Sequence, residues 1–222
     1  MTDDKQILTA HEVEAEGLGD WRILFHALHA RYRTGDFATA LRLVDAVGVA
    51  AEEMNHHPDL DLRYGQVHVR LFSHDVFGVT QRDLRLARRI SELAAGLRVR
   101  ADPSAVQVLE VALDSADPEA IKPFWRAVLG LQDSPLHDEL VDKKGVLPTL
   151  WFQRTDPHEV PRQRFHLDVR VPPEEAFARV EAALAAGGTL VSDDRAPAFW
   201  VLADAEGNKA CVTTWKGRDQ SD

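Results

Sequence analysis

Apolar residues recur every three or four positions along residues 36–54, which is the period of an amphipathic helix. Asp36 stands just before this pattern and suits the N-cap position, because its side chain can accept a backbone N–H. Residues 66–71 instead alternate between apolar and polar, which predicts a strand with one buried face. The helix stripe that we expect to face the core consists of Phe37, Ala40, Leu41, Val44, Val47, Ala51 and Met54.

A second helix is predicted over residues 81–97, where the apolar stripe returns and Thr80 and Asp83 have the spacing of a capping box. Residues 21–33 are typical of two short strands ahead of the first helix. The predicted order is therefore β-β-α-β-β-α. We expect an antiparallel sheet with one covered face.

Periodicity is lost over residues 98–104, which contain Asp102-Pro103, so we place a domain linker there. The expected domains are residues 1–100 and 105–222. In the second domain, a strand and a helix at residues 106–129 are echoed by a strand and a helix at residues 165–186. This echo predicts an internal duplication of a βαβββ unit, and the fold class is α+β overall.

Composition narrows the class of protein. The chain has 222 residues and a formal net charge of -10, which makes nucleic acid an unlikely partner. It has no apolar run long enough to span a membrane and its first residues lack the pattern of a signal peptide. Cys211 is the one cysteine, so no disulfide within the chain is possible. We expect a cytoplasmic protein without a membrane partner.

Histidines provide the candidate chemistry. His56 and His57 follow the first predicted helix, and His74 follows the alternating strand. Imidazoles exchange protons near neutral pH, so a cluster of them can supply both a general acid and a general base. Three histidines could instead bind zinc, but no cysteine or glutamate completes a familiar ligand spacing. We therefore expect no metal and no cofactor.

The spacing of Glu52, His56-His57-Pro58, Tyr64, His74 and Asp83 resembles the pterin-4a-carbinolamine dehydratase family, over residues 18–97. The resemblance implies an enzyme, a 4a-hydroxytetrahydrobiopterin dehydratase (hydro-lyase), which converts a small-molecule pterin to the quinonoid dihydropterin. It also implies a homo-oligomer, at least a dimer. Where animal members of the family carry an aspartate before the paired histidines, this chain has Asn55.

The same resemblance implies roles for individual residues. His56 and His74 would act as general acid and base, and His57 and Tyr64 would help to hold the pterin. Glu52 would orient a histidine, and its spacing from His56 would place both on one helical face. For Asp83 two roles stay open, because it can contact the substrate or cap the second helix.

Residues 105–215 resemble the glyoxalase-like branch of the glyoxalase/bleomycin-resistance (vicinal oxygen chelate) superfamily, through LDSADPEAIKPFW, FHLDVRV and EGNKACV. In metal-dependent members three positions bind a divalent ion, and here those positions carry Glu110, His166 and Cys211. Only His166 has the familiar identity, so we expect Cys211 to be a small buried residue rather than a ligand. A small molecule could bind in the cup of this domain, and its possible lining is Trp125, Trp151, Phe165 and Trp200.

Two other functions remain open at this stage. The chain could be a non-catalytic oligomer whose second domain binds or senses a ligand, since a fold does not determine a function. Alternatively, it could be a metal-dependent glyoxalase-type enzyme centred on the second domain. The complete set of His56, His57 and His74 favours the dehydratase.

Overall fold

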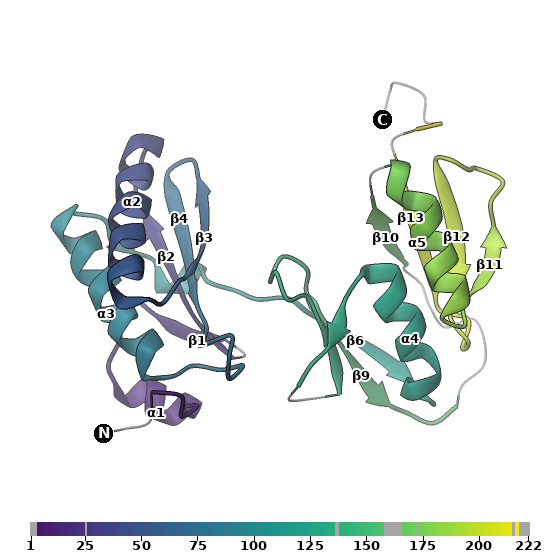
Figure 1. Cartoon of the computed structure of the whole chain (residues 1–222), viewed down its shortest axis with the longest axis horizontal. Coiled ribbons are helices and arrows are strands. Elements are labelled where there is room, and N and C mark those ends of the chain that lie inside the picture. The colour runs from purple at the N-terminus through teal and green to yellow at the C-terminus, as the bar shows by residue number, and fades with distance from the viewer. Residues whose placement is uncertain are drawn as a thin grey trace. The chain divides into compact units, whose positions relative to one another are not determined.

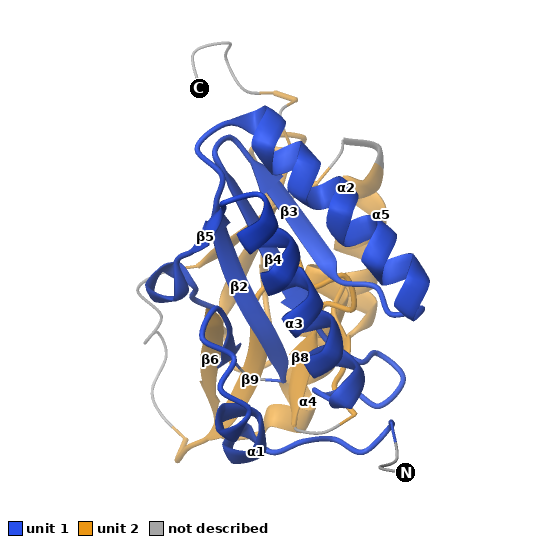
Figure 2. Ribbon diagram, turned by 90° about the vertical axis from the view of Figure 1, so that its left-hand side faces the viewer, with its two compact units in different colours: residues 1–108 blue, residues 109–222 orange. Residues whose placement is uncertain are grey.

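The computed structural model describes residues 4–24, 26–135, 138–157, 166–171, 173–214 and 216–217. The chain forms two compact units, Met1–Val108 and Leu109–Asp222, which Figure 2 draws in different colours. Within the described parts of the chain, no helix is both long and apolar enough to cross a membrane.

The N-terminal unit is a twisted antiparallel sheet with helices α2 and α3 on the same side (Figure 1). Its strands run in the order β1-β2-β4-β3, with β5 also paired to β2. The bounds of its elements are α1 Ala10–Ala15, β1 Arg22–Leu24, β2 Ala27–Arg33, α2 Phe37–Met54, β3 Asp59–Arg63, β4 Gln66–Leu71, α3 Gln81–Gly96 and β5 Arg100–Ala101. The predicted β-β-α-β-β-α order is confirmed, while α1 and β5 were not predicted. Both are too short to show a clear period.

The ends of the two long helices follow from their capping residues. The Asp36 carboxylate accepts the Thr39 N–H at the start of α2. Asn55 ends that helix with a left-handed φ of 47°, a conformation that asparagine tolerates better than most residues. At the start of α3, Thr80 and Asp83 form the predicted capping box.

Alternation along β4 is confirmed, since Val67, Val69 and Leu71 are buried beneath the helices. The stripe predicted for α2 is partly wrong: Phe37 and Leu41 are 49% and 46% exposed. The buried row of α2 consists instead of Ala40, Leu43, Val47, Ala50 and Ala51. The apolar face of this helix is therefore wider than the core that it covers.

The other face of the sheet carries polar side chains. His29 on β2 is buried there, and its Nδ1 lies 3.1 Å from Nε2 of His68 on β4. Burial, together with the nearby His68 and Arg70, lowers the pKa of His29 to about 3. The folded unit thus keeps this imidazole neutral well below the pH at which an exposed histidine becomes charged.

We therefore expect the N-terminal unit to lose stability in acid because of His29. The unfolded chain takes up a proton below pH 6.5, the ordinary pKa, whereas the folded unit does so only near pH 3. Stability is full above that ordinary value and falls as the pH drops, by about 2 kcal/mol between pH 8 and pH 5. Urea unfolding of a fragment of residues 1–108, followed through the fluorescence of Trp21, would measure this loss.

Two single variants should be compared. His29→Asn removes the buried histidine, and His11→Asn, the control, removes an exposed histidine of α1. His29→Asn should flatten the dependence of unfolding free energy on pH, and His11→Asn should not. Equal slopes in wild type and His29→Asn would contradict this assignment.

The C-terminal unit contains the predicted duplication. Its sheets have the orders β6-β9-β8-β7 and β10-β13-β12-β11. In each sheet the strand that comes first in the chain, β6 or β10, pairs in parallel with the strand that comes last in the chain, β9 or β13. The first copy comprises β6 Glu110–Ser115, α4 Pro118–Leu129, β7 Gln132–Asp133, β8 Glu139–Val141 and β9 Thr149–Arg154. The second comprises β10 Leu167–Arg170, α5 Pro173–Ala185, β11 Thr189–Ser192, β12 Phe199–Ala203 and β13 Lys209–Thr213. The strand expected from residue 106 begins only at Glu110, after a short 3₁₀ turn at Pro103–Ala105.

Helices α4 and α5 share one core with the inner faces of both sheets. Trp125 is fully buried in this core and its Nε1–H donates to Asp204, so it does not line a cup. Trp200 packs against the same core, and Trp151 is half-buried. Phe165, the fourth predicted lining residue, lies outside the described residues.

Candidate functional site

The three predicted histidines line one pocket in the N-terminal unit. This histidine pocket has a volume of about 210 Å³ and lies where α2 ends and β4 runs into the following turn. Its lining consists of Asn55, His56, His57, Phe72, Ser73, His74 and Asp75. The chain therefore brings His56, His57 and His74 together, although two of them are separated from the third by a whole β-hairpin.

His56 is held from behind by a buried carboxylate. Its Nε2 lies 2.7 Å from Oδ1 of Asp83, and both side chains are buried. Burial alone would raise the pKa of Asp83, but hydrogen bonds from His56, Ser73 and the Thr80 amide outweigh it and lower that pKa below its usual value. An ionised Asp83 accepts the Nε2–H of His56, which leaves Nδ1 as the nitrogen that can exchange a proton.

Asp83 uses its second oxygen as well. Oδ2 accepts hydrogen bonds from the Ser73 hydroxyl at 2.7 Å and from the Thr80 amide at 2.8 Å. The residue is fully buried, with both oxygens bonded within the protein. This corrects the expectation that Asp83 contacts the substrate: it caps α3 and supports His56 at the same time.

Glu52 approaches a different histidine from the one that its spacing suggested. Its Oε1 lies 3.1 Å from Nε2 of His57, and the two side chains are 80% and 56% exposed. Helix α2 ends at Met54, so His56 is no longer on the helical face of Glu52. The expected Glu52–His56 pair is therefore wrong, and an exposed pair such as Glu52–His57 contributes little to stability.

His74 lies in the turn that connects β4 to α3. Its ring packs edge-on against Phe72 with the centroids 5.0 Å apart, and Phe72 makes a similar contact with Phe77. The turn is tight, since Phe77 has a left-handed φ of 60° and the Ser73 carbonyl accepts the Phe77 amide. Sequence reasoning missed Phe72 and Ser73, although the alternation of β4 continues through Phe72.

Tyr64 is not brought to the histidine pocket. It lies in the turn between β3 and β4 with its side chain 80% exposed. Strand β3 separates it from His57-Pro58, and at about 3.3 Å per residue its five residues span roughly 15 Å. Tyr64 therefore does not belong to the lining of this pocket, and its part in holding a pterin stays a prediction.

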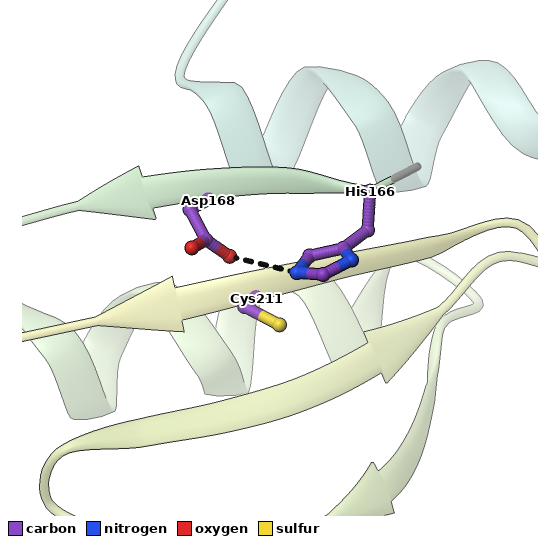
Figure 3. Close-up of side chains that lie close together, drawn as sticks. All are labelled: His166, Asp168 and Cys211. Carbon is purple, nitrogen blue, oxygen red and sulfur yellow. Dashed lines mark ion pairs between the residues drawn. The ribbon is translucent and has the colours of Figure 1, made fainter. Parts of the chain in front are cut away.

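The C-terminal unit has a second group of possible ligands, which Figure 3 shows facing one another: His166, Asp168 and Cys211. Cys211 is buried, as expected, and its burial and the adjacent Asp168 raise the pKa of its thiol to about 11. Glu110 is not part of this group; burial and the Glu139 carboxylate raise its pKa. Sequence reasoning missed Asp168.

Comparisons with known proteins agree with the two-part arrangement. Residues 4–93 match the family model "Pterin 4 alpha carbinolamine dehydratase", and residues 110–213 match the model "Glyoxalase-like domain". Among curated relatives, a protein of Thermomicrobium roseum named "Putative pterin-4-alpha-carbinolamine dehydratase" is 41% identical over 34% of this chain and 81% of its own length. A protein of the same name from Nocardia farcinica is 39% identical over 42% of this chain and 95% of its own length.

A solved structure of a transcriptional coactivator/pterin dehydratase from Brucella melitensis is 29% identical. It covers 40% of this chain and 99% of its own, with a TM-score of 0.39. With the two curated relatives matched over most of their own length, the chain belongs to the pterin-4a-carbinolamine dehydratase family through its N-terminal unit and carries a glyoxalase-like domain after it.

Proposed function

We propose that the N-terminal unit removes water from a 4a-hydroxytetrahydropterin and releases the quinonoid dihydropterin. One observation carries this proposal: three imidazoles line a single pocket, and a buried carboxylate orients one of them. In the reaction the bond between the ring carbon and the hydroxyl breaks, the hydroxyl gains a proton, and the adjacent ring nitrogen loses one. The protons balance, and no oxidant or reductant is needed.

We assign the proton from the ring nitrogen to His56. The Asp83 carboxylate stabilises the imidazolium that forms when Nδ1 of His56 takes up this proton, because its charge lies 2.7 Å from Nε2. His74 then protonates the leaving hydroxyl. Its exposed position beside Phe72 lets it return to its starting state by exchange with water.

His57 and Glu52 have a supporting role in this proposal. His57 lines the pocket, and its 3.1 Å contact with the exposed Glu52 would favour one orientation of the His57 ring when a pterin binds. A hydrogen bond from His57 would be present both before and during loss of water. Such an interaction strengthens binding without lowering the barrier to the reaction.

The direct test is to mix the full chain with freshly formed 4a-hydroxytetrahydropterin and to follow loss of water against the spontaneous rate. The protein should first be dialysed against a chelator, because imidazole proton transfer needs no metal. Acceleration that survives dialysis supports the proposal. A rate equal to the spontaneous rate would favour the hypothesis of a non-catalytic protein. Activity that is lost on dialysis and restored by one divalent ion would favour a metal-dependent enzyme.

We expect a fragment of residues 1–108 to keep the dehydratase activity of the full chain, because the histidine pocket and its supports lie within that unit. A shorter fragment of residues 9–100 should be less stable. It lacks Leu8, whose amide bonds to the Val79 carbonyl at 2.8 Å, and it cuts through β5. Thermal unfolding and activity of the two fragments would test this. A folded but inactive fragment of residues 1–108 would show that the units depend on each other.

We also propose that the chain assembles at least into a dimer. The support from the structure is the exposed apolar row on α2 that includes Phe37 and Leu41, together with the half-buried Val44. Burial of these side chains in a subunit interface would be favourable. Sedimentation equilibrium should show an oligomer that Leu41→Glu weakens and that Leu190→Glu, at an exposed apolar position of β11, leaves intact. A monomeric wild-type chain would refute the assembly.

A further inference from the structure

We infer that His166, Asp168 and Cys211 form a binding site for one borderline-soft divalent ion, zinc in the first instance, within the glyoxalase-like domain. Each contributes one possible ligand atom: an imidazole nitrogen, a carboxylate oxygen and a thiol sulfur. The sequence alone led us to expect no metal here. The inference is independent of the dehydratase proposal, which concerns the other unit.

Strand pairing brings the three side chains together. Asp168 on β10 and Cys211 on β13 are direct partners in a parallel pair, so their side chains leave the sheet on the same face. His166 is two residues before Asp168 and therefore projects on that face as well. Figure 3 shows the imidazole and the carboxylate beside each other with the sulfur close to both.

The distances suit a small ion after modest side-chain rotation. All three ligand atoms lie within 4.8 Å of one another. Around a tetrahedral zinc ion, with bonds of about 2.0–2.3 Å, ligand atoms lie roughly 3.3–3.8 Å apart. His166 Nε2 and Asp168 Oδ1 are 3.3 Å apart already, so mainly the sulfur has to approach.

Burial differs among the three ligands in a way that favours an open metal site. Cys211 is 7% exposed, whereas the side chains of His166 and Asp168 are 54% and 59% exposed. An ion can therefore enter from the solvent side and bind the sulfur at the base of the site. Three protein ligands leave the fourth tetrahedral position for water or for an oxygen atom of a small molecule, an arrangement found in zinc sites that act on ligands.

The donor set also argues for the kind of ion. Cys211 would release its thiol proton to water as the ion binds, and the resulting thiolate with an imidazole and one carboxylate suits zinc or cobalt, whereas calcium and magnesium prefer oxygen ligands alone. Among the residues that the structure describes, no other group of three histidine, cysteine or acidic side chains meets the same distance limit. Glu110 stands at the first-strand position that binds the ion in metal-dependent relatives, but it is not in this group. The third ligand proposed here is Asp168 instead.

Cobalt binding tests the inference directly, because Cys211 is the one cysteine of the chain. The untagged full chain, freed of metal by a chelator, should take up one equivalent of Co²⁺ with a thiolate-to-cobalt charge-transfer absorption. Any such absorption must come from Cys211. Zinc should displace the cobalt and abolish the band. Absence of the band in the folded wild-type chain would overturn the inference.

Variants locate the other two ligands. Cys211→Ser should abolish the band, and Asp168→Asn and His166→Ala should each weaken zinc binding roughly tenfold or more in calorimetry. Glu110→Gln is the matched control and should bind zinc like wild type, as should Asp194→Asn, at an exposed aspartate of the same unit. Far-ultraviolet circular dichroism would check folding. If Asp168→Asn binds as tightly as wild type while Glu110→Gln does not, the ligand set proposed here is wrong.

Discussion

Replacement of His74 by alanine should lower turnover of a 4a-hydroxytetrahydropterin by about 100-fold or more, and His56→Ala should do the same. Each variant removes one of the two groups to which we assign a proton transfer with the substrate. Stopped-flow measurement of dehydration at saturating substrate gives the effect on turnover. His74→Ala is the cleaner variant, because His74 is exposed whereas His56 is bonded to a buried carboxylate.

The double variant His56→Ala, His74→Ala should lose less than the product of the two single effects. Once either proton transfer fails, the other group has little left to assist, so the effects are not additive. His57→Ala should instead raise the Michaelis constant more than it lowers turnover, since the hydrogen bond that we propose from His57 to the pterin would be the same before and during the reaction. Near-normal turnover in His74→Ala would refute the assignment of roles.

Asp83→Ala should lower the free energy of unfolding of the N-terminal unit by about 3 kcal/mol, the usual cost of breaking a buried charged pair. The substitution leaves the Nε2–H of His56 without a partner at a buried position and removes the carboxylate that caps α3. Urea unfolding of the 1–108 fragment would measure this loss. The affinity for the pterin and the turnover should both decline, because Asp83 no longer holds the His56 ring in one orientation.

Asp75→Ala is the matched control for stability. Asp75 also carries a carboxylate in an ion pair, with Arg82 at 2.6 Å, but 42% of its side chain is exposed. Exposed pairs of this kind contribute about 1 kcal/mol or less. If the two alanine variants lost equal amounts of stability, Asp83 would not have the supporting role described for it.

Local features of the fold were accessible from the sequence. Asp36 and the Thr80–Asp83 box mark helix starts because capping depends only on residues within one turn. Alternation in β4 likewise requires only one strand. The extent of the α2 core face could not be predicted, since Phe37 and Leu41 continue the apolar period without being covered by the unit.

The candidate site shows the same limit. The histidines could be grouped because their spacing resembles a known family, but Asp83 was interpreted only as a cap or a substrate contact. Its bond to His56 joins residues 27 positions apart and depends on how α3 packs beside the end of α2. Spacing within a helix suggested Glu52 as the partner of His56, yet Asn55 ends that helix first.

In the second unit, duplication was visible as an echo in the sequence, whereas the convergence of Asp168 and Cys211 was not. Their contact arises from parallel pairing of the first and last strands of one βαβββ copy. Such long-range pairing leaves no local pattern in either strand. An aspartate two residues after a histidine is common in sequences. It does not indicate a metal site until the residue beside it on the neighbouring strand is known.

The measurement that tests the central claim most directly is the initial rate of dehydration of freshly formed 4a-hydroxytetrahydropterin by the full chain, compared between His74→Ala and His166→Ala. We place the reaction in the histidine pocket of the N-terminal unit. The rate of the His74→Ala variant should therefore fall by about 100-fold or more, toward the spontaneous rate, while the His166→Ala variant should keep the wild-type rate. A normal rate in His74→Ala, or loss of dehydration in His166→Ala, would contradict this placement.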